Sequence, residues 1–146
     1  MPFDRILIGV DGSRGGEAAA RLGGELAAGR DAEVLLVYAV PLPPIVPGVD
    51  QAISEESLDY LKETAAKALG DSVDILAAMN VKAEEIMKAG SPADVILSVA
   101  EDRDVEVIVV GHRGFGAMKR FILGSVSSKL AHHARCALLL APVEVE

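Results

Sequence analysis

The sequence is poor in aromatic residues and in cysteine, and it contains no tryptophan. Aromatic residues make up 3% of the 146 residues, so the hydrophobic core must be built from Val, Ile, Leu and Ala, as is typical of parallel sheets flanked by helices. Cys136 is the sole cysteine, which excludes an intramolecular disulfide. We interpret it as a small packed hydrophobic residue rather than a nucleophile.

Long hydrophobic runs are also missing. No apolar stretch approaches the ~18 residues that a membrane-spanning helix needs. The opening residues Met-Pro-Phe-Asp-Arg lack the basic and then apolar layout of a signal peptide. We therefore expect a cytoplasmic protein with no membrane partner.

Basic residues are outnumbered, with 14 Lys and Arg against 22 Asp and Glu and a formal net charge of −8. Nucleic-acid binding usually needs a broad basic face and stacking aromatic residues, so we expect no nucleic-acid partner. A chain of this length suits one ordinary domain, which we expect to span residues 1–146.

Short apolar runs alternate with helical patterns along the chain. Strands are predicted over residues 5–10, 34–40, 81–87, 105–110 and 137–141. Helices are predicted from the cap Ser13 to Gly29, over about 51–80, from Pro92 through Ala100, and from Gly124-Ser125 to about Ala134. This alternation predicts an α/β fold with a parallel sheet and right-handed crossovers. The strand over 81–87 is more polar than the others, which favours a place near the sheet edge.

The most informative stretch is VEVIVVGHRGFGAMKRFILGSVSSK, residues 105–129. A buried-strand pattern is followed by glycines at 111, 114 and 116 and then by Gly124-Ser125 at the start of a helix. Glycines let backbone approach an anion closely, and the free N–H groups of a first helical turn attract phosphate. The strand, glycine-rich loop and helix start therefore predict a phosphate site.

Charge supports the same interpretation. Arg113, Lys119 and Arg120 give the segment between Gly111 and Gly124 a local charge of +3, with no acidic residue. A flexible basic surface loop remains the alternative, because loose glycine patterns often occur without a ligand. The spacing matches neither the P-loop nor the dinucleotide-binding fingerprint. If the first and fourth strands are neighbours, Asp11 and Gly111 meet in one crevice at the carboxyl ends of the strands.

Two further segments keep open interpretations. The prolines at 41, 43, 44 and 47 suit either a lid or pocket rim, or a plain connector. Acidic residues at 55, 56, 59 and 63 share a face of the long helix, which we interpret as a solvated surface rather than a metal site. His112 is expected to be exposed, and the adjacent His132 and His133 make a poor metal pair.

The glycine pattern resembles the nucleotide motif of the universal stress protein family, in its ATP-binding version. That motif is glycine, two residues, glycine, nine residues, glycine and then Ser or Thr, and Gly111, Gly114, Gly124 and Ser125 match it without a gap. The opening RILIGVDGS and the closing ARCALLLAPVE are also similar to the family's first and last strands. The resemblance implies a doubly wound, Rossmann-like domain with five strands in the order 3-2-1-4-5. It also implies a homodimer through the C-terminal strand.

The resemblance also implies roles for individual residues. Asp11 would contact the ribose, with helix-start polarity as its structural alternative, and Val40 would line the adenine pocket through apolar contact and backbone groups. Ser125 and Ser127 could also serve as helix caps. The implied ligand is ATP, alone or with Mg²⁺ or Mn²⁺. The full set of implied binding residues is Gly9, Val10, Asp11, Val40, Val110, Gly111, Arg113, Gly114, Gly124, Ser125, Val126 and Ser127.

Three functions remain open from the sequence. The first is a nucleotide-binding stress-response or signalling module whose occupancy alters its stability, dimer or partners. The second is a slow ATP-hydrolysing or phosphate-transferring enzyme, although no residue is identified as a general base and we name no catalytic residue. The third is a dimeric interaction module with a vestigial pocket, which the intact motif counts against.

Overall fold

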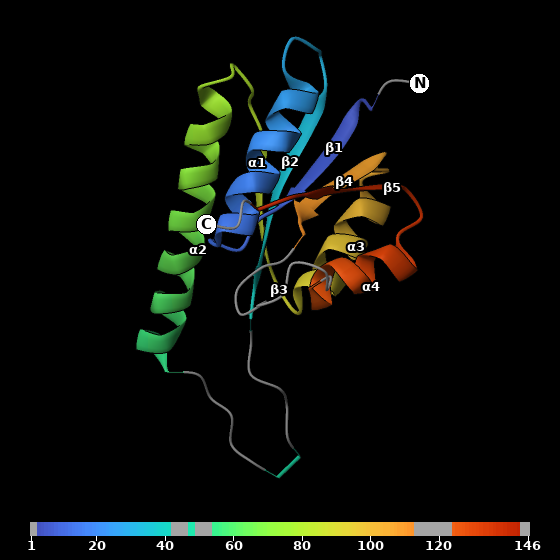
Figure 1. Ribbon diagram of the computed structural model, residues 1–146. Coiled ribbons are helices and arrows are strands. Elements are labelled where there is room, and N and C mark those ends of the chain that lie inside the picture. Colours follow the sequence, from blue (N-terminus) through green and yellow to red (C-terminus); the bar gives the residue numbers. More distant parts are fainter. Residues whose placement is uncertain (1–2, 42–46, 49–53, 113–123, 144–146) are drawn as a thin grey trace.

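The computed structural model describes residues 3–41, 47–48, 54–112 and 124–143. Strands and helices alternate as the sequence predicts (Figure 1). The strands are β1 (Arg5–Gly9), β2 (Glu33–Val40), β3 (Glu84–Ala89), β4 (Val107–Gly111) and β5 (Ala137–Ala141). The helices are α1 (Arg14–Ala27), α2 (Glu55–Ala77), α3 (Pro92–Asp102) and α4 (Ser125–His133).

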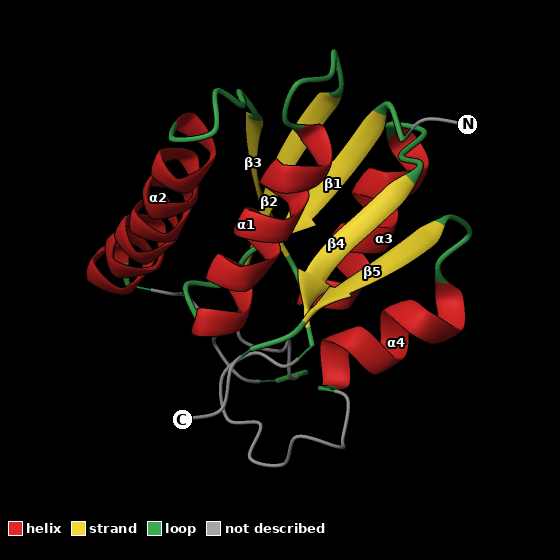
Figure 2. Ribbon diagram, turned by 45° about the horizontal axis from the view of Figure 1, so that its top comes forward, coloured by secondary structure: helices red, strands yellow, loops and turns green. Residues whose placement is uncertain are grey.

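All five strands form one parallel sheet in the order β3-β2-β1-β4-β5, which confirms the expected topology. Figure 2 shows α1 in front of this sheet and α3 behind it. The chain winds from β1 toward β3 and then returns to β4 beside β1, so the winding reverses between β1 and β4. A ligand site in such a sheet is expected beyond the carboxyl ends of these two strands.

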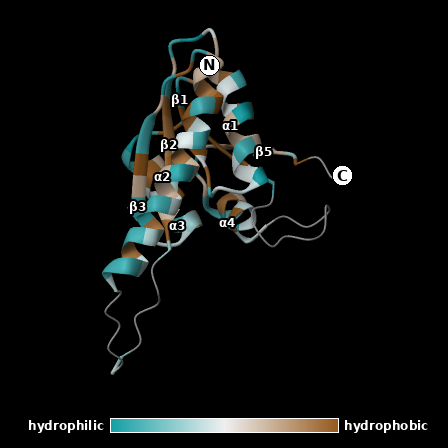
Figure 3. Ribbon diagram, turned by 90° about the vertical axis from the view of Figure 1, so that its left-hand side faces the viewer, coloured by the Kyte–Doolittle hydropathy of each residue, from teal (hydrophilic) through white to brown (hydrophobic). Residues whose placement is uncertain are grey.

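The core lies on both faces of the sheet, because alternate residues of each strand point to opposite sides. Ile6, Ile8 and Val34 pack on the face covered by α1 and α2. Leu7 and Leu35 pack on the other face, with residues of α3 and α4. Figure 3 shows hydrophobic colour on the central strands and hydrophilic stretches on α2. Burial on both faces explains why the central strands read as continuous apolar runs.

Local signals set several helix starts. Ser13 caps α1, and its hydroxyl accepts a hydrogen bond from the Gly16 N–H at 3.2 Å, as predicted. Ser54 caps α2 in the same way, and α3 begins with Pro92 in its first turn. The four acidic residues predicted to share a solvated face of α2 are all exposed.

Among the strands, β3 differs most from its predicted bounds. The pattern over residues 81–87 predicts a strand there, whereas β3 spans Glu84–Ala89. Val81 is buried, but its N–H donates to the Leu76 carbonyl at 3.0 Å, so it belongs to the connection after α2. β3 lies at the sheet edge, as its polar sequence predicts.

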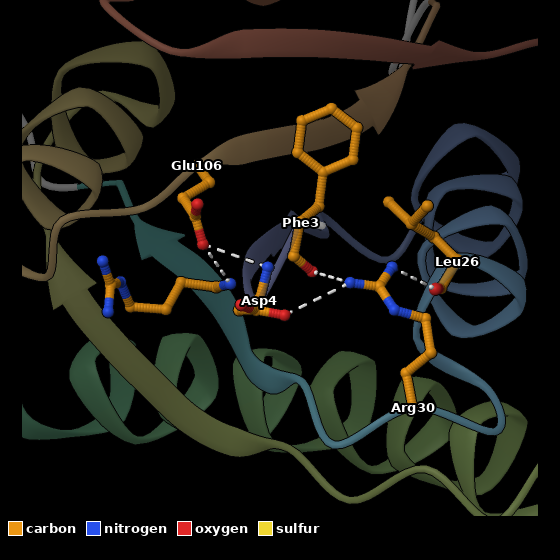
Figure 4. A network of polar contacts seen from close by, with 6 residues as sticks. Phe3, Asp4, Leu26, Arg30 and Glu106 are labelled. Carbon is orange, nitrogen blue, oxygen red and sulfur yellow. Dashed lines mark hydrogen bonds and ion pairs between the residues drawn. The ribbon is translucent and has the colours of Figure 1, made fainter. Parts of the chain in front are cut away.

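Polar contacts fasten the amino-terminal end of the sheet (Figure 4). Arg30, which follows α1, donates to the Phe3 carbonyl at 2.7 Å and lies 3.5 Å from the Asp4 carboxylate. Glu106, just before β4, accepts from the N–H groups of Asp4 and Arg5 at 3.0 and 3.1 Å. These bonds hold β1 between α1 and β4, at the end of the sheet opposite the expected ligand site.

Two further predictions from the sequence concern the proline-rich segment and membrane-spanning helices. Most of the proline-rich segment after β2 lies outside the described residues. Within the described part of the chain, no helix is long and apolar enough to cross a membrane.

Candidate functional site

The candidate site lies where β1 and β4 end side by side. The register pairs Ile8 of β1 with Val109 of β4, which confirms that the first and fourth strands are neighbours. In Figure 2 the arrowheads of β4 and β5 point toward the region where α4 begins. The carboxyl ends of the central strands and the start of α4 therefore lie at the same end of the molecule.

Asp11 is held in a turn between β1 and α1. Its Oδ1 accepts from the Ser13 N–H at 2.9 Å and from the Ser13 hydroxyl. Gly12 sits between them with a φ of +85°, a conformation that favours glycine. Among the described residues, Oδ2 of Asp11 has no hydrogen-bond partner. The structural role of Asp11 thus uses one oxygen, and the other remains available for the predicted contact.

Glycines in the first turn of α1 lie close to the ends of β1 and β4. A Cβ on Gly111 would lie 2.6 Å from the Cα and carbonyl oxygen of Gly15, in the first turn of α1. A Cβ on Gly16 would lie 3.0 Å from the backbone N and Oδ1 of Asp11. Asp11 and Gly111 therefore flank one glycine pair, in agreement with the expected crevice. Sequence reasoning missed Gly15 and Gly16, for which the only signal was the adjacent pair after the Asp11 turn.

The two ends of the glycine-rich segment are joined by the backbone of His112. Its N–H donates to the Ala141 carbonyl of β5 at 2.8 Å, and its carbonyl accepts from the Gly124 N–H at 3.2 Å. The Ser127 hydroxyl donates to the same carbonyl at 2.8 Å. Arg113 and Gly114, which were predicted to contact the phosphates, lie outside the described residues.

The start of α4 carries backbone donors that have no acceptor among the described residues. The N-cap position belongs to Gly124, and Ser125 and Ser127 lie inside the helix. The interpretation of these two serines as caps is therefore wrong. The N–H groups of Ser125, Val126 and Ser127 occupy the first turn, where a helix offers no acceptors. These three N–H groups have no acceptor in the described part of the chain. The helix dipole adds partial positive charge at this end of α4. The arrangement is suited to an anion.

The end of β2 offers a backbone donor and acceptor pair. The Val37 carbonyl accepts from the Val10 N–H, and the Val40 carbonyl accepts from the Gly90 N–H, both at 3.0 Å. Backbone groups of alternate residues face opposite sides, so Ala39 faces the side of β1, as Val37 does. β1 has ended at this level, and neither the N–H nor the C=O of Ala39 has a partner among the described residues. Sequence reasoning missed Ala39, because its role depends on where β1 stops.

Three of the predicted contact residues are buried at the ends of β1 and β4. Val10 and Val110 belong to the two core clusters. A Cβ on Gly9 would lie 2.8 Å from Cδ1 of Ile96 and 3.0 Å from Cγ1 of Val110. Gly9 thus lets α3 approach the end of β1. The predicted contacts of Gly9, Val10 and Val110 with a ligand stay a prediction.

Tyr38 is a buried polar group beside the site that the sequence did not single out. The residue is 7% exposed and packs in the same core cluster as Val10 and Val40. Burial, and secondly the negative charge of Asp11, raise the pKa of its phenol above the ordinary value of 10.0. Tyr38 therefore stays neutral at physiological pH, close enough to Asp11 for the two groups to interact electrostatically.

Metal-ligating side chains do not gather in the described part of the chain, where no three His, Cys, Asp or Glu residues form a cluster suited to an ion. Asp11 is the one acidic residue among those that we have placed at the site. A divalent cation here would depend on oxygens supplied by a ligand.

The profile of the Universal stress protein family matches residues 2–142, which is nearly the whole chain. The universal stress protein YxiE of Bacillus subtilis is 31% identical over 145 residues, covering 94% of this chain and 98% of the relative. A universal stress protein of Methanothermobacter thermautotrophicus is 36% identical over 121 residues, which is 80% of each chain.

Solved structures share the fold. The universal stress protein UspA from Lactobacillus plantarum matches with a TM-score of 0.81 and 22% identity, covering 97% of this chain and 99% of the other. The protein from Archaeoglobus fulgidus in complex with dAMP matches with a TM-score of 0.68 and 23% identity, covering 99% and 100%. A family protein from Arabidopsis thaliana with AMP bound matches with a TM-score of 0.68 and 18% identity, covering 97% and 92%.

Proposed function

Because this chain belongs to the universal stress protein family, we propose that it binds an adenine nucleotide, with ATP as the physiological ligand, at the carboxyl ends of β1, β2 and β4. One observation carries the proposal. Groups that have no partner among the described residues, and that suit a base, a ribose and a phosphate chain, lie at the same end of the sheet, on Ala39, Asp11 and the start of α4. Binding of dAMP and AMP by the relatives from Archaeoglobus fulgidus and Arabidopsis thaliana supports it.

The end of β2 would select adenine. The Ala39 N–H can donate to N1 of adenine, and its C=O can accept from the N6 amino group. Guanine has the reverse pattern, because its N1–H is a donor and its O6 is an acceptor. In the same position, guanine would place a donor against the Ala39 N–H and an acceptor against the Ala39 C=O, so neither hydrogen bond could form. The Val40 carbonyl is already bonded to Gly90, so the backbone contact expected of Val40 falls to its neighbour Ala39.

Asp11 and α4 would hold the rest of the nucleotide. The free Oδ2 of Asp11 can accept hydrogen bonds from ribose hydroxyls. The N–H groups of Ser125, Val126 and Ser127 can donate to phosphate oxygens, and Arg113 and Gly114 stay part of the proposed phosphate contact. Mg²⁺ or Mn²⁺, if it accompanies ATP, would be held mainly by phosphate oxygens and water.

In the cell we propose a nucleotide-dependent stress-response or signalling module, located in the cytoplasm and built as a single domain of residues 1–146. We also propose that it forms a homodimer through β5, the edge strand at the C-terminal side of the sheet. Nucleotide occupancy would stabilise the fold, because a ligand that binds only the folded state shifts the unfolding equilibrium.

A thermal-shift titration of nucleotide-free protein with ATP, AMP, GTP and CTP tests the proposal. At ATP about a hundredfold above Kd, the folded state should gain about 2.7 kcal/mol, which raises the melting temperature by several degrees. GTP and CTP should give much smaller shifts. If neither ATP nor AMP raises the melting temperature, the proposal is refuted.

The Asp11→Ala variant tests the assignment within the site. It removes the ribose contact and leaves the start of α4 in place, so ATP affinity should fall by about tenfold while weak binding persists. Isothermal titration calorimetry measures the change, and circular dichroism verifies the fold. Unchanged ATP affinity in a folded variant would remove Asp11 from the site.

A further inference from the structure

Ser127 occupies a different environment from the other serines of α4. It is 2% exposed, whereas Ser125 is exposed and Ser128 is half-buried. Its Oγ lies 2.8 Å from the His112 carbonyl oxygen and 3.4 Å from that of Gly111. The side chain thus points from α4 into the end of β4, and its hydroxyl proton is used within the protein.

The His112 carbonyl accepts two hydrogen bonds, and both fix the position of α4. The bond from Gly124 N–H closes the segment between residues 112 and 124. The bond from Ser127, three residues further on and on the same face of the first helical turn, sets how that turn faces β4. The next turn is attached elsewhere, because Lys129 pairs with Asp94 of α3 at 2.7 Å and both side chains are partly exposed.

The orientation of the first turn decides where its N–H groups point, which have no acceptor in the described part of the chain. Ser125 and Val126 carry two of these groups, and they precede Ser127 directly. If the bond between Ser127 and His112 is lost, the turn remains helical, but the buried contact that holds it against β4 is gone. A small rotation of the turn redirects the N–H groups, and hydrogen bonds weaken steeply with poor geometry.

We infer that Ser127 is a positioning residue for the phosphate chain, acting through the His112 carbonyl, and that its hydroxyl does not contact the nucleotide. This inference rests on the proposed function. It assigns the buried Ser127 hydroxyl to the alignment of the first turn, and it leaves the backbone N–H of Ser127 among the donors to phosphate.

The test compares Ser127→Ala with Ser128→Ala, using ATP and adenosine as separate probes in isothermal titration calorimetry. Both substitutions remove one hydroxyl from the same helix, but Ser128 makes no described side-chain hydrogen bond. We expect Ser127→Ala to weaken ATP binding about five- to tenfold and to change adenosine binding less than about twofold, since adenosine has no phosphate. Ser128→Ala should bind both probes as the parent does.

Each other result has a distinct meaning. If Ser127→Ala weakens ATP and adenosine equally, Ser127 has only a general structural role and the inference is overturned. If Ser127→Ala binds ATP as tightly as the parent, the inference is overturned while the proposed function stands. If the parent itself binds neither probe, the proposed function fails and the inference fails with it.

Discussion

At the scale of single residues, Gly111 must be a glycine because the backbone of Gly15 lies too close to it for any side chain. The family resemblance implies that Gly111 contacts phosphate, and the structure adds a reason within the protein itself. Any side chain on Gly111 would overlap the backbone of Gly15 at 2.6 Å, where no flexible group can yield. Gly111 is therefore needed for the packing of β4 against α1, whether or not a ligand is bound.

Gly111→Ala should consequently destabilise the ligand-free protein. We expect the free energy of unfolding to fall by about 1–3 kcal/mol, the usual cost of overpacking a rigid site. Urea denaturation monitored by circular dichroism measures the change. The matched control is Gly70→Ala in α2, where a Cβ meets nothing within 4 Å. This control should gain about 0.5–1 kcal/mol, because alanine favours the helix. Equal stability of the two variants would contradict the packing argument.

The sequence predicted some site residues and could not predict others. Asp11 and Ser13 follow a strand directly, and their turn chemistry is local, so they could be found from the sequence. Ala39 could not be found, because its backbone groups lack partners among the described residues only where β2 continues for three residues beyond Val37, the partner of the last residue of β1. Tyr38 was missed because a single tyrosine in a strand usually indicates core packing, and Tyr38 does pack in the core.

At the scale of elements, the strand that the sequence located least accurately was β3. Hydrophobicity placed this strand at residues 81–87, but Val81 owes its burial to the connection after α2, where Asn80 has a φ of +58°. An edge strand with mostly exposed residues carries little hydrophobic pattern. The central strands β1, β2 and β4 were located closely because both of their faces are buried.

Arg103 connects three elements at the amino end of the sheet. It follows α3 and forms two hydrogen bonds with the Glu84 carboxylate of β3, at 2.8 and 2.9 Å, and one with Glu33 of β2 at 2.9 Å. The hydrogen bond from Arg103 is the main cause that lowers the pKa of Glu84 below its ordinary value of 4.5. A bidentate pair of this kind fixes α3 relative to the sheet edge.

This arrangement predicts the acid dependence of stability. Because the folded-state pKa of Glu84 is lowered, its contribution is present above pH 4.5 and is lost as the pH falls through the lowered value. Arg103→Gln removes the cause, so its unfolding free energy should depend less on pH between about 6 and 3 than that of the parent. Urea denaturation at a series of pH values gives the slopes.

The control for Arg103 is Arg135→Gln, whose side chain lies 3.9 Å from Glu101 in a largely exposed pair. Such a pair contributes little, so this variant should keep the parental pH dependence. Identical slopes for the parent and Arg103→Gln would show that the contact with Glu84 has no effect in solution.

At the scale of the whole molecule, the alternation of strands and helices sufficed to predict a parallel α/β sheet. The strand order followed from the family resemblance, and the structure confirms it. The sheet leaves two edges, and they differ in character. β3 is polar and mostly exposed, whereas β5 reads Ala-Leu-Leu-Leu-Ala and its leucines are half-buried. An apolar edge with unpaired backbone groups favours pairing with another strand.

The backbone of β5 specifies how a second copy could pair. The Ala137 N–H donates to Glu106 at 3.2 Å and the Ala141 carbonyl accepts from His112 at 2.8 Å, so these residues face β4. By alternation, the N–H and C=O groups of Leu138 and Leu140 face outward. An antiparallel twofold pairing centred on Leu139 would place Leu138 opposite Leu140 of the second copy and satisfy all of these groups.

Leu138→Pro therefore tests the dimer with little disturbance of the sheet. Proline removes the outward N–H of Leu138 but none of the donors that face β4, and an edge position tolerates it. The control Leu138→Ala loses the leucine side chain as well but keeps the N–H. By light scattering at micromolar concentration, the parent and Leu138→Ala should have the mass of a dimer, and Leu138→Pro that of a monomer. Circular dichroism should show the same secondary structure in all three. A dimeric Leu138→Pro, or a monomeric parent, would exclude pairing through β5, because this geometry leaves the outward N–H groups of Leu138 and Leu140 as the only donors on that strand for a second copy.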